Sequence, residues 1–278
     1  MPPALASREY KLMLRAAGFA GSEAALIAQV AAFWRDFSDA VAGHGIATDG
    51  AFIRSKERPV TFYDTADRHL NNKDVLFRDY VFRVRSRADG TAKVTLKYRH
   101  PDRLVAGDRD LTATKKLLKK REIKFERDIK PVQRRMRSLY SYSGSGRTKD
   151  TLSVDTVDDI VALFPDLGKQ LDVTLDEPVA PVSGFTAREL VLEGGRISLS
   201  GQQVAECAVV IWYDRSANPT TPVVAEFSFR HPRKHATDPR FTATEARVAC
   251  RAFHAALDLD DWAATTQQTK TAYVYAMS

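Results

Sequence analysis

The sequence has little cysteine and lacks the motifs of several common catalytic and metal sites. Only two of its 278 residues are cysteines, Cys207 and Cys250, and they form no CxxC pair, which disfavours a zinc site of the usual kind. The sequence allows a single disulfide between them, but two reduced thiols are the simpler interpretation. The six histidines form no HExxH motif, and neither GxSxG nor a P-loop GxxxxGK occurs. These absences disfavour zinc-peptidase, serine-hydrolase and P-loop chemistry.

Long apolar runs are also missing. No stretch approaches the 18 apolar residues of a transmembrane helix, and the opening "MPPALASREYKLML" lacks the basic and apolar regions of a signal peptide. We therefore expect a soluble cytoplasmic protein with no membrane partner. The sequence also carries no RNA-binding aromatic motif, helix-turn-helix signature or zinc finger, so no specific nucleic-acid partner is expected. The sequence does not determine the oligomeric state, so a homodimer is kept as an alternative to a monomer.

What the sequence does contain is an ordinary apolar content and an excess of basic residues. Hydrophobic residues make up 44% of the chain, enough for a core of normal size, and the net charge is +7. Such an excess suggests an anionic partner. No internal repeat or low-complexity linker interrupts the chain, so we expect one domain over residues 1–278.

Two neighbouring segments concentrate this charge on one face. In "YVFRVRSR" (80–87) and "AKVTLKYR" (92–99), alternation places basic side chains on one side of each strand and apolar side chains on the other. The intervening "ADGT" (88–91) is typical of a hairpin turn. Because like charges on paired strands are destabilising, the two rows are expected to face an anion.

The same division into a charged and an apolar face recurs in other predicted strands. Further strands are expected at 7–14, 59–65, 121–129, 186–195, 205–214 and 223–231, and helices at 21–42, 155–167 and 242–259; 269–276 fits either type. The composition of "SYSGSGRTKD" (141–150) predicts a loop. An open sheet showing its charged faces to water would explain one such strand. For all of them together we predict an α+β fold, an eight-stranded antiparallel β-barrel (tunnel) with helices packed outside.

Carboxylates join the basic side chains in this predicted interior. They are Glu9, Glu122, Glu126, Asp214 and Glu226. Lysine and arginine bind phosphate oxygens, and carboxylates bind hard divalent cations such as Mg²⁺ or Mn²⁺. The combination predicts a site for a metal–polyphosphate complex, with metal-assisted chemistry.

Several short motifs follow one another over nearly the whole chain. They are "SREYK" (7–11), "FYDTADRHL" (62–70), "RVR" (83–85) and "TLK" (95–97), then "REIKFE", "FTAREL", "WYDR", "AEFSF" and "TKTAYVY". In this order they resemble the motifs of the CYTH, or triphosphate tunnel metalloenzyme, superfamily, whose opening ExExK corresponds to "SREYK". The resemblance implies an antiparallel tunnel that binds a triphosphate or polyphosphate and hydrolyses it with Mg²⁺ or Mn²⁺.

Carried over residue by residue, the resemblance also implies roles. The residues expected to hold phosphate are Lys11, Arg83, Arg85, Lys97, Arg188 and Lys270. Those expected to hold metal are Glu9, Asp214, Glu226 and Glu122, while Lys11 and Glu126 are expected to act in catalysis. Arg87, Lys93 and Arg99 are expected at the rim or surface.

Two departures leave the activity open. Ser7 and Ser228 stand where the family has glutamate, so a metal site would lose about two negative charges, and ligand charge sets metal affinity. Three functions therefore remain: a metal-dependent triphosphatase, a polyanion-binding protein that has lost catalysis, and a class IV-type adenylate cyclase. The cyclase would need a purine pocket, for which the sequence has no motif.

Overall fold

The computed structural model describes residues 3–72, 74–133, 135–171, 174–201, 203–216, 220–232 and 241–277. Its strands are β1 (Ser7–Leu14), β2 (Thr48–Asp49), β3 (Ile53–Thr65), β4 (Tyr80–Ser86), β5 (Ala92–His100), β6 (Leu118–Val132), β7 (Arg135–Thr148), β8 (Val179–Ser200), β9 (Gln203–Asp214) and β10 (Pro222–Pro232). Its helices are η1 (Ala16–Phe19), α1 (Glu23–Ala42), α2 (Arg103–Gly107), α3 (Val157–Leu163), α4 (Leu167–Gln170), α5 (Ala243–Leu257) and α6 (Lys270–Tyr275).

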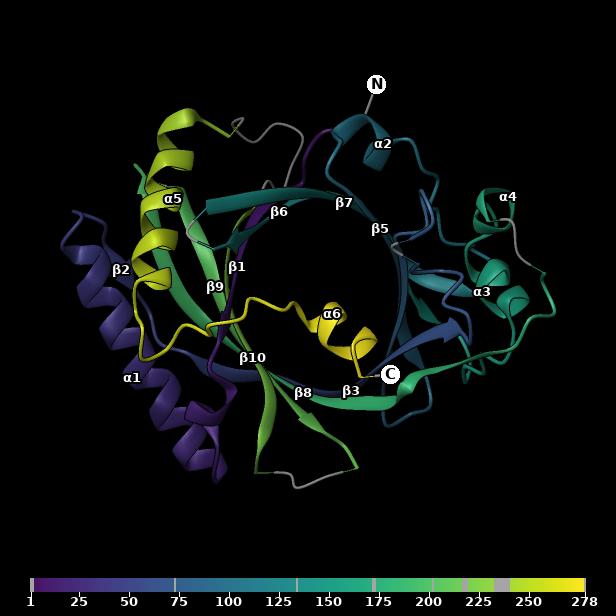
Figure 1. Cartoon of the computed structure of the whole chain (residues 1–278), viewed down its shortest axis with the longest axis horizontal. Helices are drawn as coiled ribbons and strands as arrows, with labels where there is room; N and C mark the ends of the chain where they lie inside the picture. The colour runs from purple at the N-terminus through teal and green to yellow at the C-terminus, as the bar shows by residue number, and fades with distance from the viewer. Residues whose placement is uncertain are drawn as a thin grey trace.

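Within these described residues, nine strands close into a barrel, seen from one end in Figure 1. The order around the ring is β8-β3-β4-β5-β7-β6-β1-β10-β9, and β9 returns to β8; the short β2 pairs only with β8. The pair β1–β6 is parallel and the other neighbours are antiparallel. A ring with an odd number of strands cannot alternate direction throughout, so at least one parallel pair is required.

The closed barrel and the α+β class agree with the prediction, but the expected eight antiparallel strands were wrong by one strand and by the parallel pair β1–β6. The additional strand is β7, whose second half was predicted to be a loop because it consists largely of serine and glycine. Gly144 lies where the chain leaves no room for a side chain: a Cβ there would overlap the carbonyl oxygen of Leu111. The glycine therefore serves close packing of a loop on the sheet, not a turn.

Helices cover the outer, apolar faces of the strands on two sides (Figure 1). α1 and α5 pack on β1, β8, β9 and β10 through a cluster that includes Phe33, Phe37, Phe227 and Phe253. α3 and α4 pack on β4 and β5. Two of these helices begin with side-chain caps: the Ser22 hydroxyl accepts a hydrogen bond from Ala25 N at the start of α1, and Thr242 and Glu245 form a capping box at the start of α5.

The helix α6 lies inside the outline of the ring in Figure 1. Val274 on α6 belongs to a third apolar cluster with Met13, Phe62, Val81 and Trp212, all on the inward sides of their strands. Asp64, at the end of β3, accepts a 3.0 Å hydrogen bond from the Tyr275 hydroxyl and so ties the helix to the barrel wall. α6 therefore fills one end of the barrel with apolar contacts.

Candidate functional site: a charged cavity in the barrel

The inward faces of the strands enclose a cavity of about 370 Å³. Twelve of its lining residues are lysine or arginine and seven are aspartate or glutamate, an excess of five positive charges. The charged positions follow the alternation read from the sequence, since every second residue of β4, β5 and β6 points inward. The inside of the barrel is therefore a cationic chamber with carboxylates set among the cations.

One wall is built from arginines around a single buried carboxylate. Glu189 Oε1 lies 2.7 Å from Arg58 Nη2 and 3.4 Å from Arg85 Nε, and its Oε2 accepts a 3.1 Å hydrogen bond from Trp212 Nε1. Burial raises the pKa of Glu189, but Arg85 and Arg58 outweigh it and hold that pKa well below its usual range. Glu189 is therefore an ionised counter-charge for two arginines.

Arg83, next to this group on β4, is attracted by Glu189 only at longer range. Among the described residues it makes no ion pair within 4 Å, and its Nε is buried with no hydrogen-bond partner. Burial, together with the neighbouring positive charge of Arg85, lowers the pKa of Arg83 well below its ordinary value. A buried donor without a partner costs free energy, so the Arg83 Nε is an unsatisfied position in the ligand-free barrel.

The opposite wall is a network of lysines and carboxylates on β1, β5 and β6. Lys11 Nζ lies 2.9 Å from Asp128 and 3.0 Å from Glu9, while Lys97 Nζ lies 3.8 Å from both Glu126 and Asp128. Burial opposes ionisation of Asp128, but Lys11 and Lys97 overcome it and lower the pKa of Asp128. For Lys97 the balance is reversed: burial lowers its pKa to about 8, although Asp128 partly offsets the effect.

A third contact joins the cavity to α6. Lys270 Nζ lies 2.6 Å from Glu226 Oε1 on β10. Thr271 accepts a 3.2 Å hydrogen bond from Arg99, whose Nε also lies 3.7 Å from Asp128. The end of the barrel filled by α6 is thus linked to both β5 and β10.

Most of the residues predicted for the site come together in this cavity. Those that line it are Glu9, Lys11, Arg83, Arg85, Lys97, Glu122, Glu126, Glu226 and Lys270. Lys93 and Arg99, which were expected at the rim or surface, line it as well.

Two predicted residues lie outside it. Arg188 is on the outward face of β8, 3.3 Å from Glu57, and its guanidinium stacks 4.6 Å from the centre of the Tyr213 ring. Asp214 ends β9 and accepts hydrogen bonds from the backbone and side chain of Ser216. Placing Arg188 and Asp214 in the cavity was therefore a mistake: alternation turns Arg188 away, and Asp214 closes a turn at the strand end.

Several cavity residues were not singled out from the sequence. Glu189 follows Arg188 directly, and it lines the cavity together with Val191 and Glu193. The prediction therefore chose the residue one position before the one that faces inward. Asp128 continues the alternation of Glu122 and Glu126 by one more step, which was a usable signal. Ser143 and Ser145 on β7 also line the cavity, and their small side chains leave room opposite Lys97 and Thr95.

The cavity carboxylates do not form a ready-made metal site. Ser7, in place of a glutamate, donates a 2.8 Å hydrogen bond to Glu126, and Ser228 lies in register with Lys11. Glu9, Glu126, Asp128, Glu189 and Glu226 each lie within 4 Å of a lysine or arginine. Such contacts occupy the oxygens that Mg²⁺ or Mn²⁺ would need, so these residues do not fit a metal centre built by the protein alone.

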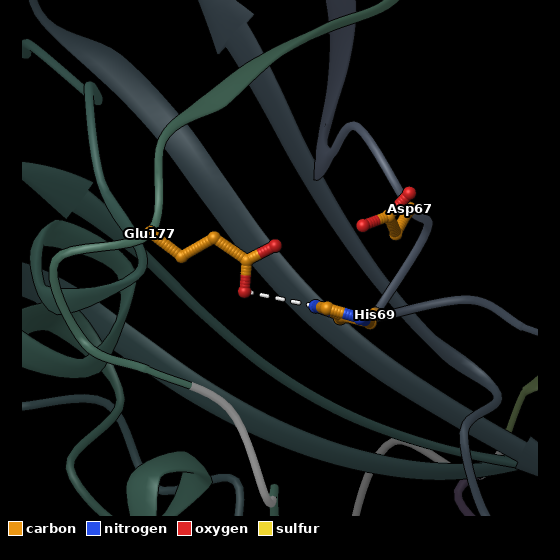
Figure 2. Close-up of side chains that lie close together, drawn as sticks. All are labelled: Asp67, His69 and Glu177. Carbon is orange, nitrogen blue, oxygen red and sulfur yellow. Dashed lines mark hydrogen bonds and ion pairs between the residues drawn. The ribbon is translucent and has the colours of Figure 1, made fainter.

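A different trio meets the geometric requirement for metal ligands. In the part of the chain that the structure describes, only Asp67, His69 and Glu177 bring three potential ligand atoms within 4.8 Å of one another, and they lie outside the cavity (Figure 2). His69 Nδ1 lies 2.8 Å from Glu177 Oε2, as the dashed line in Figure 2 marks, while Asp67 is exposed. The contact between His69 and Glu177, 108 residues apart, joins two loops, and no sequence spacing could reveal it.

The two thiols also lie apart from the cavity. Cys207 is buried and Cys250 partly buried, and both are free.

No helix in the described ranges is both long and apolar enough to cross a lipid bilayer. No protein-family model matches the sequence, and no curated protein is detectably similar to it.

Proposed function

We propose that the barrel binds the phosphates of a linear triphosphate or polyphosphate. The observation that carries the proposal is Arg83, a guanidinium whose buried Nε has no partner and which faces a cavity with five excess positive charges. Arg83, Arg85, Lys11 and Lys97, here called the central belt, would hold phosphate oxygens, with the arginines able to bind two oxygens at once. The order of sequence motifs that resembles the triphosphate tunnel superfamily supports the same ligand.

Binding is favoured over hydrolysis because of the state of the carboxylates. The predicted metal ligands Glu9 and Glu226 contact Lys11 and Lys270, at 3.0 and 2.6 Å, and the serines at 7 and 228 supply no charge. Metal-dependent triphosphate hydrolysis is the second candidate. It is favoured by the register of β1 on β6, which sets Glu9 beside Asp128 and Ser7 beside Glu126 in one wall.

Calorimetric titration with tripolyphosphate tests the binding proposal. Arg83→Gln and Lys97→Met are each expected to weaken binding by about tenfold to a hundredfold, the value of a hydrogen bond to a charged group. Arg188→Gln is the matched control, since it removes the same charge from the outer face of the barrel. Absence of tripolyphosphate binding by the unaltered protein, or equal losses in Arg188→Gln and Arg83→Gln, would contradict the proposal.

The same preparations separate binding from turnover. Phosphate release from tripolyphosphate, ATP and thiamine triphosphate is measured with Mg²⁺ and with Mn²⁺. Binding without release is expected for the binding protein. Release that Glu226→Gln abolishes would instead assign the hydrolase, and cyclic AMP among the products of ATP would assign the cyclase.

A further inference from the structure

Three basic residues lie side by side on three neighbouring strands, at the end of the barrel opposite α6. Lys93 on β5 lies in register with Arg147 on β7, and Arg147 lies in register with Lys119 on β6. Ser145, two residues before Arg147, lines the cavity, as Lys93 does. Partners in register share a face of the sheet, so these three residues, here called the mouth row, all belong to the inward face.

The mouth row has little negative charge to balance it. Among the described residues Lys119 and Arg147 make no ion pair. Lys93 lies 3.9 Å from Glu122, but that carboxylate also lies 3.0 Å from Lys124. Asp89, in the turn between β4 and β5, directs its Oδ1 to the backbone and hydroxyl of Thr91 and attracts Arg147 without forming an ion pair within 4 Å. Like charges on directly opposed residues are destabilising, so the row is arranged at a cost that an anion would offset.

The row continues the cationic lining beyond the central belt. Lys93 and Lys97 share the inward face of β5 and are four residues apart, which is about 13 Å along the strand. Arg99 and Thr271 meet at the other end of the barrel, where α6 fills the interior. An anion that touches both the belt and the mouth row must therefore extend along the barrel axis, with its inner end toward α6 and its outer end at the row.

We propose that the ligand is a linear inorganic polyphosphate whose inner phosphates occupy the central belt and whose outer phosphates bind Lys93, Arg147 and Lys119. This rests on the proposed function, because it takes the belt as the inner phosphate site. Single-stranded nucleic acid is a poorer fit, since its binding sites combine basic grooves with aromatic side chains on which bases stack. The aromatic residues that line the cavity, Phe62 and Trp212, belong to the apolar cluster at the α6 end, away from the mouth row.

Chain length is the variable that tests this proposal. Tripolyphosphate and a long polyphosphate are titrated calorimetrically into the full chain, into Lys119→Gln/Arg147→Gln, and into Arg83→Gln. The control Arg35→Gln/Lys169→Gln removes the same two charges from exposed positions on helices outside the barrel. Thermal unfolding of each variant establishes that it is folded.

The expected pattern is a difference between the two ligands. The mouth-row variant loses at least about tenfold in affinity for long polyphosphate and stays within about twofold for tripolyphosphate, whereas Arg83→Gln loses affinity for both. Equal effects of the mouth-row variant on both ligands, no effect on either, or a loss matched by the control would overturn the mouth row while leaving the belt intact. Absence of tripolyphosphate binding by the unaltered protein would instead contradict the proposal that the central belt binds phosphate. Tighter binding of single-stranded oligonucleotide than of polyphosphate, lost with the mouth row, would reassign the ligand.

Discussion

The ammonium of Lys11 on β1 lies 2.9 Å from the carboxylate of Asp128 on β6, and this contact joins two parallel strands inside the barrel. The pKa of Asp128 is lowered in the folded protein: burial raises it, but Lys11, Lys97 and Arg99 outweigh that effect. A carboxyl group whose folded pKa is depressed stabilises the protein above its unfolded pKa of 3.8 and loses that contribution as the pH falls toward the folded value.

Asp128→Asn is therefore expected to lower the free energy of unfolding by about 2 kcal/mol at pH 7, with the deficit shrinking as the pH falls below 4. Urea unfolding at pH 7, 4 and 3 measures it. Asp261→Asn, at an exposed position, serves as the control. A deficit that stays constant across this range would show that the Asp128 charge is not the source of the stability.

Lys97 is expected to make the proposed anion binding depend on pH. Its pKa in the ligand-free protein is about 8, mainly because of burial. A bound phosphate favours the charged ammonium and raises that pKa, so affinity for tripolyphosphate is full below pH 8 and falls above it, by up to about tenfold per pH unit. Calorimetry between pH 7.5 and 9.5 measures this. Lys97→Arg, which keeps its charge, is expected to remove the decline; an unchanged decline in that variant would exclude Lys97 as its origin.

Arg83 is expected to lower the stability of the ligand-free protein and to strengthen its binding of tripolyphosphate. Its buried, unpartnered Nε costs free energy in the empty protein, so Arg83→Met is expected to raise the free energy of unfolding by about 1 kcal/mol. The same change is expected to weaken tripolyphosphate binding by about tenfold to a hundredfold. The matched variant Arg85→Met removes a partner of Glu189 and is expected to lower stability. Thermal melts without and with tripolyphosphate distinguish the two. A destabilised Arg83→Met protein would mean that Arg83 is satisfied within the barrel itself.

Gly144 on β7 is expected to tolerate no side chain. A Cβ there overlaps the carbonyl oxygen of Leu111, which is backbone and cannot move aside easily, so Gly144→Ala is expected to cost about 1–3 kcal/mol. Gly18→Ala, where no atom lies within 4 Å of the added Cβ, is the control and should leave the melting temperature nearly unchanged. Equal melting temperatures for both variants would show that the Leu111 segment adapts.

The sequence was most informative where alternation was strict. Arg83, Arg85 and Lys97 are flanked by apolar residues that pack under α3 and α4, so their inward direction follows from period alone. β7 was missed because Ser143, Gly144 and Ser145 are typical of a loop, while its actual role is to supply small residues to a crowded wall. Composition reports local preference, and here tertiary packing overrode it.

The misplaced site residues have a similar cause. In β8 the charged pair Arg188 and Glu189 offers two registers, and a one-residue shift exchanges the inner and outer faces. The neighbours of that strand, not its own residues, decide that Glu189 faces the arginines of β3 and β4. The joined loops of His69 and Glu177 likewise depend on a contact between segments more than 100 residues apart.

The parallel pairing of β1 with β6 has a consequence for how the chain acquires its structure. β1 (Ser7–Leu14) lies between β6 and β10, so it gains its second neighbour only when residue 232 has been made. Until then one of its edges is unsatisfied and the ring is open, a state prone to pairing with other chains. Closure between distant segments is also intrinsically slow. The order of the strands in the ring therefore leaves β1 with an unpaired edge from its own synthesis until β10 is complete.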